Sequence, residues 1–121
     1  MIKGFIIILI IIGTVFISLI PGFHPEKSIN QSYSKSLDMI LHSGHYLIIT
    51  ILISFILTKL NKLTILFYLL SFSTLLEICQ IWINGRSFTI FDLLSNIIGI
   101  TTGIILIRFY NHFKIANKNI I

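Results

Sequence analysis

Four long apolar stretches, separated by short polar segments, organise the chain. They cover residues 4–20, 38–58, 63–83 and 90–110. Because about 20 apolar residues in a helix span the hydrocarbon core of a bilayer, each stretch predicts a transmembrane helix. The second and third stretches are joined only by Lys59 to Lys62, which indicates a tight hairpin. Segment 21–37 holds both prolines and shows no periodicity, so we expect a polar surface loop there.

The composition is that of a membrane protein. Hydrophobic residues make up 55% of the 121 residues, charged residues only 11%, and the mean hydropathy is +0.98. A soluble domain would carry about 25% charged residues. The first stretch is longer than the apolar core of a signal peptide, and no small-residue cleavage site follows it. We therefore expect one all-α domain over residues 1–121, a bundle of four transmembrane helices.

The distribution of Lys and Arg predicts the orientation of the bundle. Six of these residues lie at the N-terminus, in the second turn or at the C-terminal end: Lys3, Lys59, Lys62, Arg108, Lys114 and Lys118. Three lie on the opposite side: Lys27, Lys35 and Arg86. Because cytoplasmic loops carry the excess of Lys and Arg, both termini are expected in the cytoplasm. The net charge of +5 is thus explained by topology and contact with lipid headgroups, and nucleic acid is not an expected partner.

The residue usage points to a source and excludes one kind of covalent link. Ile is the commonest residue, whereas Val15 and Ala116 are the only Val and Ala. This bias is typical of an AT-rich bacterial genome, so a multi-pass protein of the bacterial cytoplasmic membrane is expected. Cys79 is the single cysteine and excludes an intrachain disulfide.

Three pairs of polar residues interrupt the apolar pattern at helical spacing. They are Asp38 with His42, Glu77 with Gln80, and Asp92 with Asn96. Each pair shares a helix face, because its members are three or four residues apart. In the four-helix arrangement, all three pairs fall near one membrane surface, within reach of Arg86 in the third loop. A charged group at membrane depth costs about 2.5–3.5 kcal/mol, so these groups need partners or a function.

Two glycines extend the polar face of the fourth stretch. Gly99 and Gly103 follow Asn96 at intervals of three and four residues. A small-x-x-x-small pattern lets the backbone of another helix approach closely. These glycines therefore predict a helix-packing contact.

The same residues resemble the pattern of the VanZ-like membrane proteins, a family named for a protein associated with teicoplanin resistance. The matching elements are Asp38, His42 and Tyr46, then Glu77-x-x-Gln80, Gly85-Arg86-Ser87, Thr89, Asp92, Asn96, Gly99 and Gly103. The resemblance covers residues 15–107 and departs at Met39, where the family usually has Lys. It implies a cell-envelope membrane protein with an effect on glycopeptide susceptibility, and it assigns no reaction.

The leading functional hypothesis is an outward-facing polar pocket that binds a lipid or wall-precursor headgroup. Its candidate ligand-binding residues are Arg86, Asp38, His42, Glu77, Gln80, Asp92 and Asn96. Arg86 would hold an anion through its planar guanidinium. The structural alternative for Glu77 is an ion pair with Arg86 or a hydrogen bond to Gln80, His42 or Asn96. The other structural alternatives are a helix cap at Asp92, an interhelical hydrogen bond at Asn96 and a packed His42.

Two other functional classes fit the sequence. One is a membrane-embedded enzyme of unknown reaction, with Glu77 and His42 as the catalytic acid and base. The other is a non-catalytic accessory subunit in which the polar cluster only holds helices together.

No metal is expected, because one cysteine and dispersed histidines have no metal-binding spacing. No cofactor is expected either. Membrane lipids, a lipid-linked envelope precursor and a second copy of the chain are the expected partners.

The predicted topology can be tested in the loop between the third and fourth stretches. A cysteine placed within residues 84–91 of a Cys79→Ser chain should react with a membrane-impermeant maleimide added outside intact cells. The positive-inside distribution requires that side to be external. Labelling only after the cytoplasm is opened would show that the topology is inverted.

Overall fold

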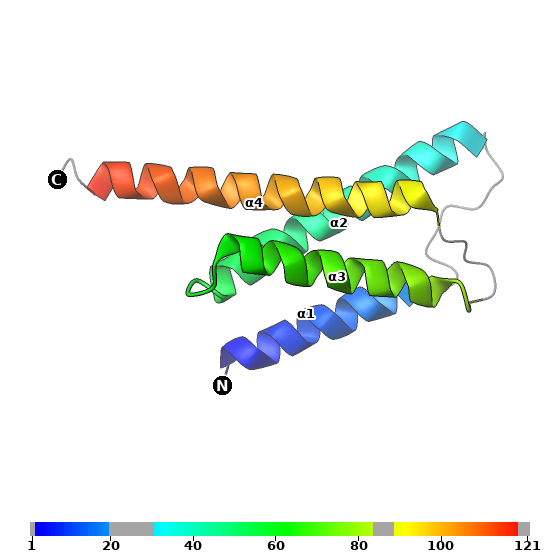
Figure 1. Ribbon diagram of the computed structural model, residues 1–121, viewed down its shortest axis with the longest axis horizontal. Helices are drawn as coiled ribbons and strands as arrows, with labels where there is room; N and C mark the ends of the chain where they lie inside the picture. The colour runs from blue at the N-terminus through cyan, green and yellow to red at the C-terminus, as the bar shows by residue number, and fades with distance from the viewer. Residues whose placement is uncertain (1, 20–30, 84–88, 119–121) are drawn as a thin grey trace.

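The protein is a bundle of four antiparallel helices. The computed structural model describes residues 2–19, 31–83 and 89–118. The helices are α1 (Ile2–Leu19), α2 (Gln31–Ile56), α3 (Lys62–Gln80) and α4 (Ile90–Lys118). All four are long and apolar enough to cross a membrane, which confirms the prediction of an all-α fold with four helices of membrane-spanning length and composition. The start of α1 and the end of α4 lie at the same end of the bundle (Figure 1).

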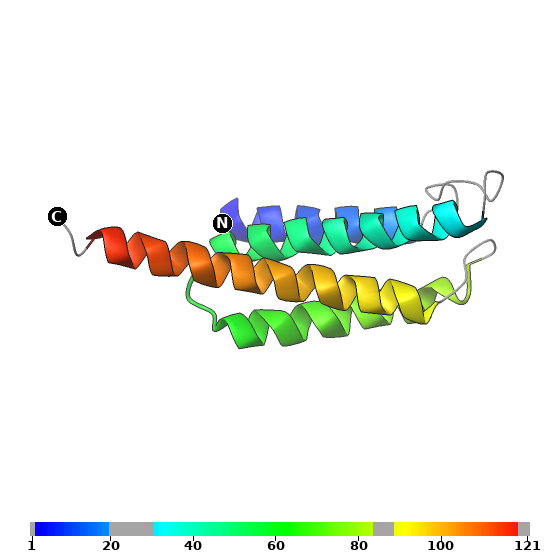
Figure 2. The ribbon, with the colours of Figure 1, turned by 90° about the horizontal axis from the view of Figure 1, so that it is seen from above.

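Two helices are longer than the hydropathy pattern predicts. α2 begins at Gln31 rather than at residue 38, because the segment 31–37 contains no Pro or Gly that would stop a helix. α4 continues to Lys118 and projects beyond the other helices (Figure 2). The residues after Tyr110 again include neither Pro nor Gly, and cationic side chains near a helix C-terminus are favourable. The apolar stretches therefore give the spans, whereas the helices extend past them.

The hairpin between α2 and α3 is closed by a helix cap. Asn61 has an extended backbone conformation, and its side chain accepts a hydrogen bond from the backbone N–H of Leu63 at 3.1 Å. This contact satisfies one of the backbone donors that a helix start leaves unpaired. α3 then ends at Gln80, three residues before the predicted boundary at 83.

The closest helix contact lies between α2 and α4. A Cβ added at Gly99 would collide with the backbone carbonyl of Ser43, and one added at Gly103 would lie 2.8 Å from the Cβ of Thr50. The two backbones can approach this closely only because neither glycine carries a side chain. The packing contact predicted at Gly99 and Gly103 is thus confirmed.

The surface of the bundle is apolar, and many of its buried groups are small and polar. Large hydrophobic side chains such as Phe5, Phe67 and Phe113 are exposed, as a lipid environment requires. Several hydroxyls inside the bundle donate to a carbonyl four residues earlier on their own helix. Thr50 donates to Tyr46 at 2.6 Å and Ser95 to Phe91 at 2.8 Å. These hydroxyls find their hydrogen-bond partners on their own helix, so the helix faces can pack without further polar contacts.

α1 lies at the side of the bundle. Within the described residues it packs against α2 and α3 and does not contact α4. Its two inward-facing buried residues, Thr14 and Ser18, are four positions apart and share one face. The core cluster is centred elsewhere, on α2, α3 and α4: Tyr46, Ile49, Ile65, Leu69, Ile100 and Ile104. α2 and α4 thus form the centre of the bundle, and α1 packs at its side.

The glycine contact predicts which small substitutions destabilise the bundle. Gly99→Ala should lower the free energy of unfolding by about 1–3 kcal/mol, because the added methyl group forces α2 and α4 apart. Gly13→Ala is the matched control, since nothing lies within 4 Å of a Cβ at that position. Thermal unfolding of the purified proteins in detergent measures the difference. Equal stability of the two variants would contradict the close contact.

Candidate functional site

Six of the predicted site residues lie at one end of the bundle, here called the polar end. It is the end where α2 and α4 begin and α3 stops (Figure 1). α2 contributes Asp38 and His42, α3 contributes Glu77 and Gln80, and α4 contributes Asp92 and Asn96. The helical spacing put each pair on one face, and the antiparallel order of the helices puts the three faces at one depth. The remaining predicted residue, Arg86, lies outside the described residues.

Asn96 joins the polar side chains of the three helices. Its Nδ2 donates a hydrogen bond to Glu77 Oε1 at 2.9 Å, and its Oδ1 lies 3.2 Å from His42 Nδ1. His42 Nδ1 is also 3.6 Å from Glu77 Oε1. Glu77 is only 1% exposed and Asn96 is fully buried. The network is therefore inside the bundle, where electrostatic contacts are stronger than in water.

The hydrogen-bond chain fixes the protonation of one ring nitrogen. A carboxylate oxygen only accepts, so the Asn96 amide nitrogen must face Glu77. The amide oxygen then faces His42, and because it also only accepts, His42 Nδ1 must carry a proton. The other nitrogen, Nε2, faces Asp38 Oδ1 at 3.7 Å. His42 thus separates a buried carboxylate on one side from a half-buried carboxylate on the other.

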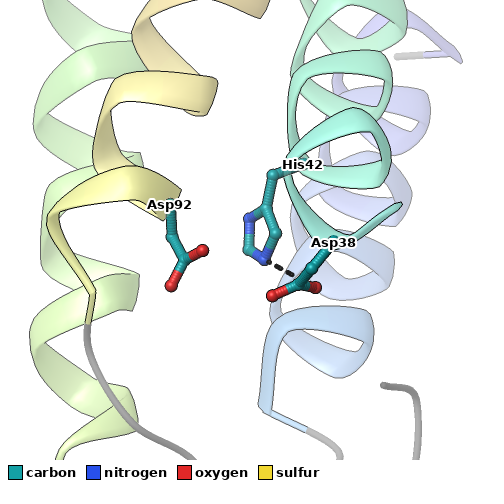
Figure 3. Close-up of side chains that lie close together, drawn as sticks. All are labelled: Asp38, His42 and Asp92. Atoms are coloured by element: carbon teal, nitrogen blue, oxygen red, sulfur yellow. Dashed lines mark ion pairs between the residues drawn. The ribbon is translucent and has the colours of Figure 1, made fainter. Parts of the chain in front are cut away.

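Asp92 has two roles in the geometry. It stands in the first turn of α4, where its backbone N–H donates to Thr89 Oγ1 at 3.3 Å and its Oδ2 accepts from the same hydroxyl at 2.6 Å. The Thr89 hydroxyl therefore caps α4, and Asp92 in the first turn supports that cap instead of being the capping residue itself. The carboxylate also lies beside Asp38 and His42 (Figure 3).

Gln80 is held away from this network. Although it is buried, its Nε2 donates to the backbone carbonyl of Ser18 on α1 at 3.2 Å. Gln80 therefore links α3 to α1. The spacing of Gln80 and Glu77 predicted that they share a helix face. The hydrogen-bond partner of Gln80, however, belongs to α1, which contributes none of the three polar pairs.

A cavity of about 470 Å³ adjoins the polar end between α1 and α2. Apolar residues of both helices line it, together with four polar ones: Ser18, Asp38, His42 and His45. Within the described part of the chain, His45 Nε2 is buried and has no hydrogen-bond partner. Neither His45 nor Ser18 is among the site residues predicted from the sequence. The one available signal was that Thr14 and Ser18 are polar residues of α1 at helical spacing.

The fold and this cluster define a class, a multi-pass α-helical membrane protein with ionisable side chains buried at one end of a four-helix bundle. Within that class, a model of the VanZ/LLP1 family matches residues 5–111, so the chain belongs to this family. The family match confirms the resemblance that the polar motif predicts. No curated protein and no solved structure matches the chain.

Proposed function

We propose that the protein binds the headgroup of a lipid or lipid-linked envelope precursor at the polar end, with the lipid chain in the adjoining cavity. The observation that carries this proposal is the combination of a mostly apolar cavity with ionisable groups on its wall. Ligand sites are mostly apolar spaces with a few placed polar groups. The cavity between α1 and α2 has that composition, and it lies in a bundle of helices that are long and apolar enough to cross a membrane.

Two features of the cavity wall favour a polar ligand over an acyl chain alone. His45 Nε2 is buried without a hydrogen-bond partner among the described residues, which costs free energy unless a ligand or water satisfies it. Asp38 and His42 line the same cavity and are tied to the buried network around Asn96. A headgroup there would meet both donors and acceptors.

The charge of the site restricts how an anionic headgroup can bind. Asp38, Glu77 and Asp92 bring three carboxyl groups to the polar end. An anion therefore needs a cationic contact, and Arg86 is the proposed one, with a planar fork that suits phosphate or carboxylate. The proposed setting is the bacterial cytoplasmic membrane, with both termini in the cytoplasm and the site open to the outer leaflet. Sequestering such a precursor would alter susceptibility to teicoplanin-type glycopeptides.

A second candidate function is catalysis on a membrane-embedded substrate. The observation that favours it is the close approach of His42 Nδ1 to Glu77 Oε1, at 3.6 Å. Buried carboxyl and imidazole groups in contact can exchange protons with a substrate. A chemically altered form of the co-purified lipid would favour catalysis over binding.

Filling the cavity should expel the lipid. Gly44 lines the cavity, and nothing lies within 4 Å of a Cβ built there, so Gly44→Leu places a side chain in open space. We expect native mass spectrometry to detect a co-purified lipid on the wild type and to lose it in Gly44→Leu. Gly13→Leu is the control, since its position is equally open and does not line this cavity. Lipid retained by a folded Gly44→Leu protein would contradict the proposal.

The charged residues should separate a binding site from a purely structural cluster. Glu77→Gln and Arg86→Lys preserve size while they remove a charge or the planar fork. If the cluster is a site, both variants keep their thermal stability, and teicoplanin susceptibility of cells returns to that of cells without the protein. Loss of stability in step with activity would identify the accessory-subunit alternative. A wild-type susceptibility with both folded variants would remove these residues from the site.

A further inference from the structure

Two helices bring three potential metal ligands together at the polar end. A ring nitrogen of His42 and carboxylate oxygens of Asp38 and Asp92 all lie within 4.8 Å of one another. Figure 3 shows the side chain from α4 directed toward the pair on α2. Asp38 and Asp92 are more than fifty positions apart in the sequence, which is why local spacing predicts no metal site.

The ring of His42 is oriented as in metal-binding histidines. Such histidines usually donate the second ring N–H to a carboxylate or carbonyl, which fixes the tautomer and directs the other nitrogen at the ion. Here Nδ1 donates to Asn96 Oδ1, and the Asn96 amide in turn donates to the buried Glu77. Nε2, the nitrogen that a neutral ring leaves unprotonated, is the one that faces Asp38. Asn96 and Glu77 are thus the supporting residues of the arrangement, outside the three ligands.

Asp92 supplies an independent indication. It is only 7% exposed, and it forms no ion pair with Lys or Arg anywhere in the described part of the chain. Within the same residues its carboxylate accepts one hydrogen bond, from Thr89 to Oδ2. A buried carboxylate with so little compensation is costly, and a cation beside it would remove that cost.

We propose that Asp38, His42 and Asp92 bind a divalent transition-metal ion of the Zn²⁺ type. The set of one imidazole nitrogen and two carboxylate oxygens suits Zn²⁺, whereas Mg²⁺ and Ca²⁺ prefer oxygen ligands alone. Around a tetrahedral ion with bonds of about 2.1 Å, neighbouring ligand atoms lie roughly 3.4 Å apart. His42 Nε2 and Asp38 Oδ1 are 3.7 Å apart, close to that spacing, and the Asp92 ligand oxygen lies within 4.8 Å of the other two ligand atoms. Three protein ligands leave the fourth position of the ion open.

A bound ion would also explain how a site rich in carboxylates accepts an anionic headgroup. This consequence rests on the proposed function. Two of the site's carboxylates would be neutralised by the metal, and the open coordination position would take an oxygen of the phosphate or carboxylate headgroup. The ion would act there as the cationic contact alongside Arg86. The ion-binding inference itself needs no lipid.

The test is a Zn²⁺ titration of the full-length protein in detergent, after removal of its affinity tag, lipid and metal. We expect one Zn²⁺ per chain by calorimetry and elemental analysis, together with a rise in the unfolding temperature. Asn96→Leu removes a supporting contact and should weaken Zn²⁺ binding by roughly 10- to 100-fold. Asp38→Asn and Asp92→Asn each remove a ligand and should weaken Zn²⁺ binding by at least as much. His112→Gln is the control, because this exposed histidine lies near the opposite end of α4.

Three results of the titration would overturn the metal-site proposal. No Zn²⁺ binding, binding unchanged in both folded aspartate variants, or tighter binding of Mg²⁺ than of Zn²⁺ overturns the proposal. Asp92→Asn also alters the cap of α4 and could unfold the protein for that reason. Asp38→Asn leaves α4 untouched, so its Zn²⁺ affinity is the deciding measurement if Asp92→Asn unfolds. Because the titration uses protein without lipid, its failure would leave the headgroup proposal intact. Lipid retained by Gly44→Leu would leave the metal site intact.

Discussion

The contact of α2 and α4 at Gly99 and Gly103 sets the geometry of the polar end. It holds the α4 backbone against the Ser43 backbone of α2 at Gly99 and against the Thr50 side chain at Gly103. Asn96 lies one turn before Gly99, and at this separation its amide reaches His42 on the facing helix. A bulkier residue at Gly99 would widen the helix pair and lengthen the contact. The polar network is thus a consequence of backbone packing one turn away.

Satisfaction of polar groups in an apolar solvent then orders the side chains. Lipid offers no hydrogen bonds, so buried groups must find partners inside the bundle. Several hydroxyls, such as those of Thr14, Thr50 and Ser95, bond to their own helix and specify no partner. Glu77 and Asn96 bond across helices instead, and so determine how α3 and α4 face each other. Gln80 does the same for α3 and α1 through the Ser18 carbonyl.

The sequence predicted the helices and their polar faces better than it predicted partners. Hydropathy located the four spans because bilayer thickness requires long apolar runs. It gave poor helix ends, since α2 and α4 extend past the membrane-length segments where hydropathy carries no signal. Periodicity showed which residues share a face on one helix, but not how helices rotate about their axes. For that reason only the structure revealed the Gln80–Ser18 contact and the approach of the Asp92, Asp38 and His42 ligand atoms to within 4.8 Å, although the sequence placed those three residues near one membrane surface.

The energetics of the polar end bear on the choice between a binding site and a purely structural cluster. Interhelical hydrogen bonds in membranes average about 0.6 kcal/mol, so the contacts around Asn96 stabilise the bundle only modestly. Burying a carboxylate such as Glu77 opposes folding, and apolar side chains of similar volume commonly hold helices together at least as well. The bundle also leaves a cavity directly beside this costly cluster, although close packing there would stabilise it. The proposed headgroup ligand would lie in that cavity and contact the buried cluster, so its binding energy would offset part of what the cluster costs.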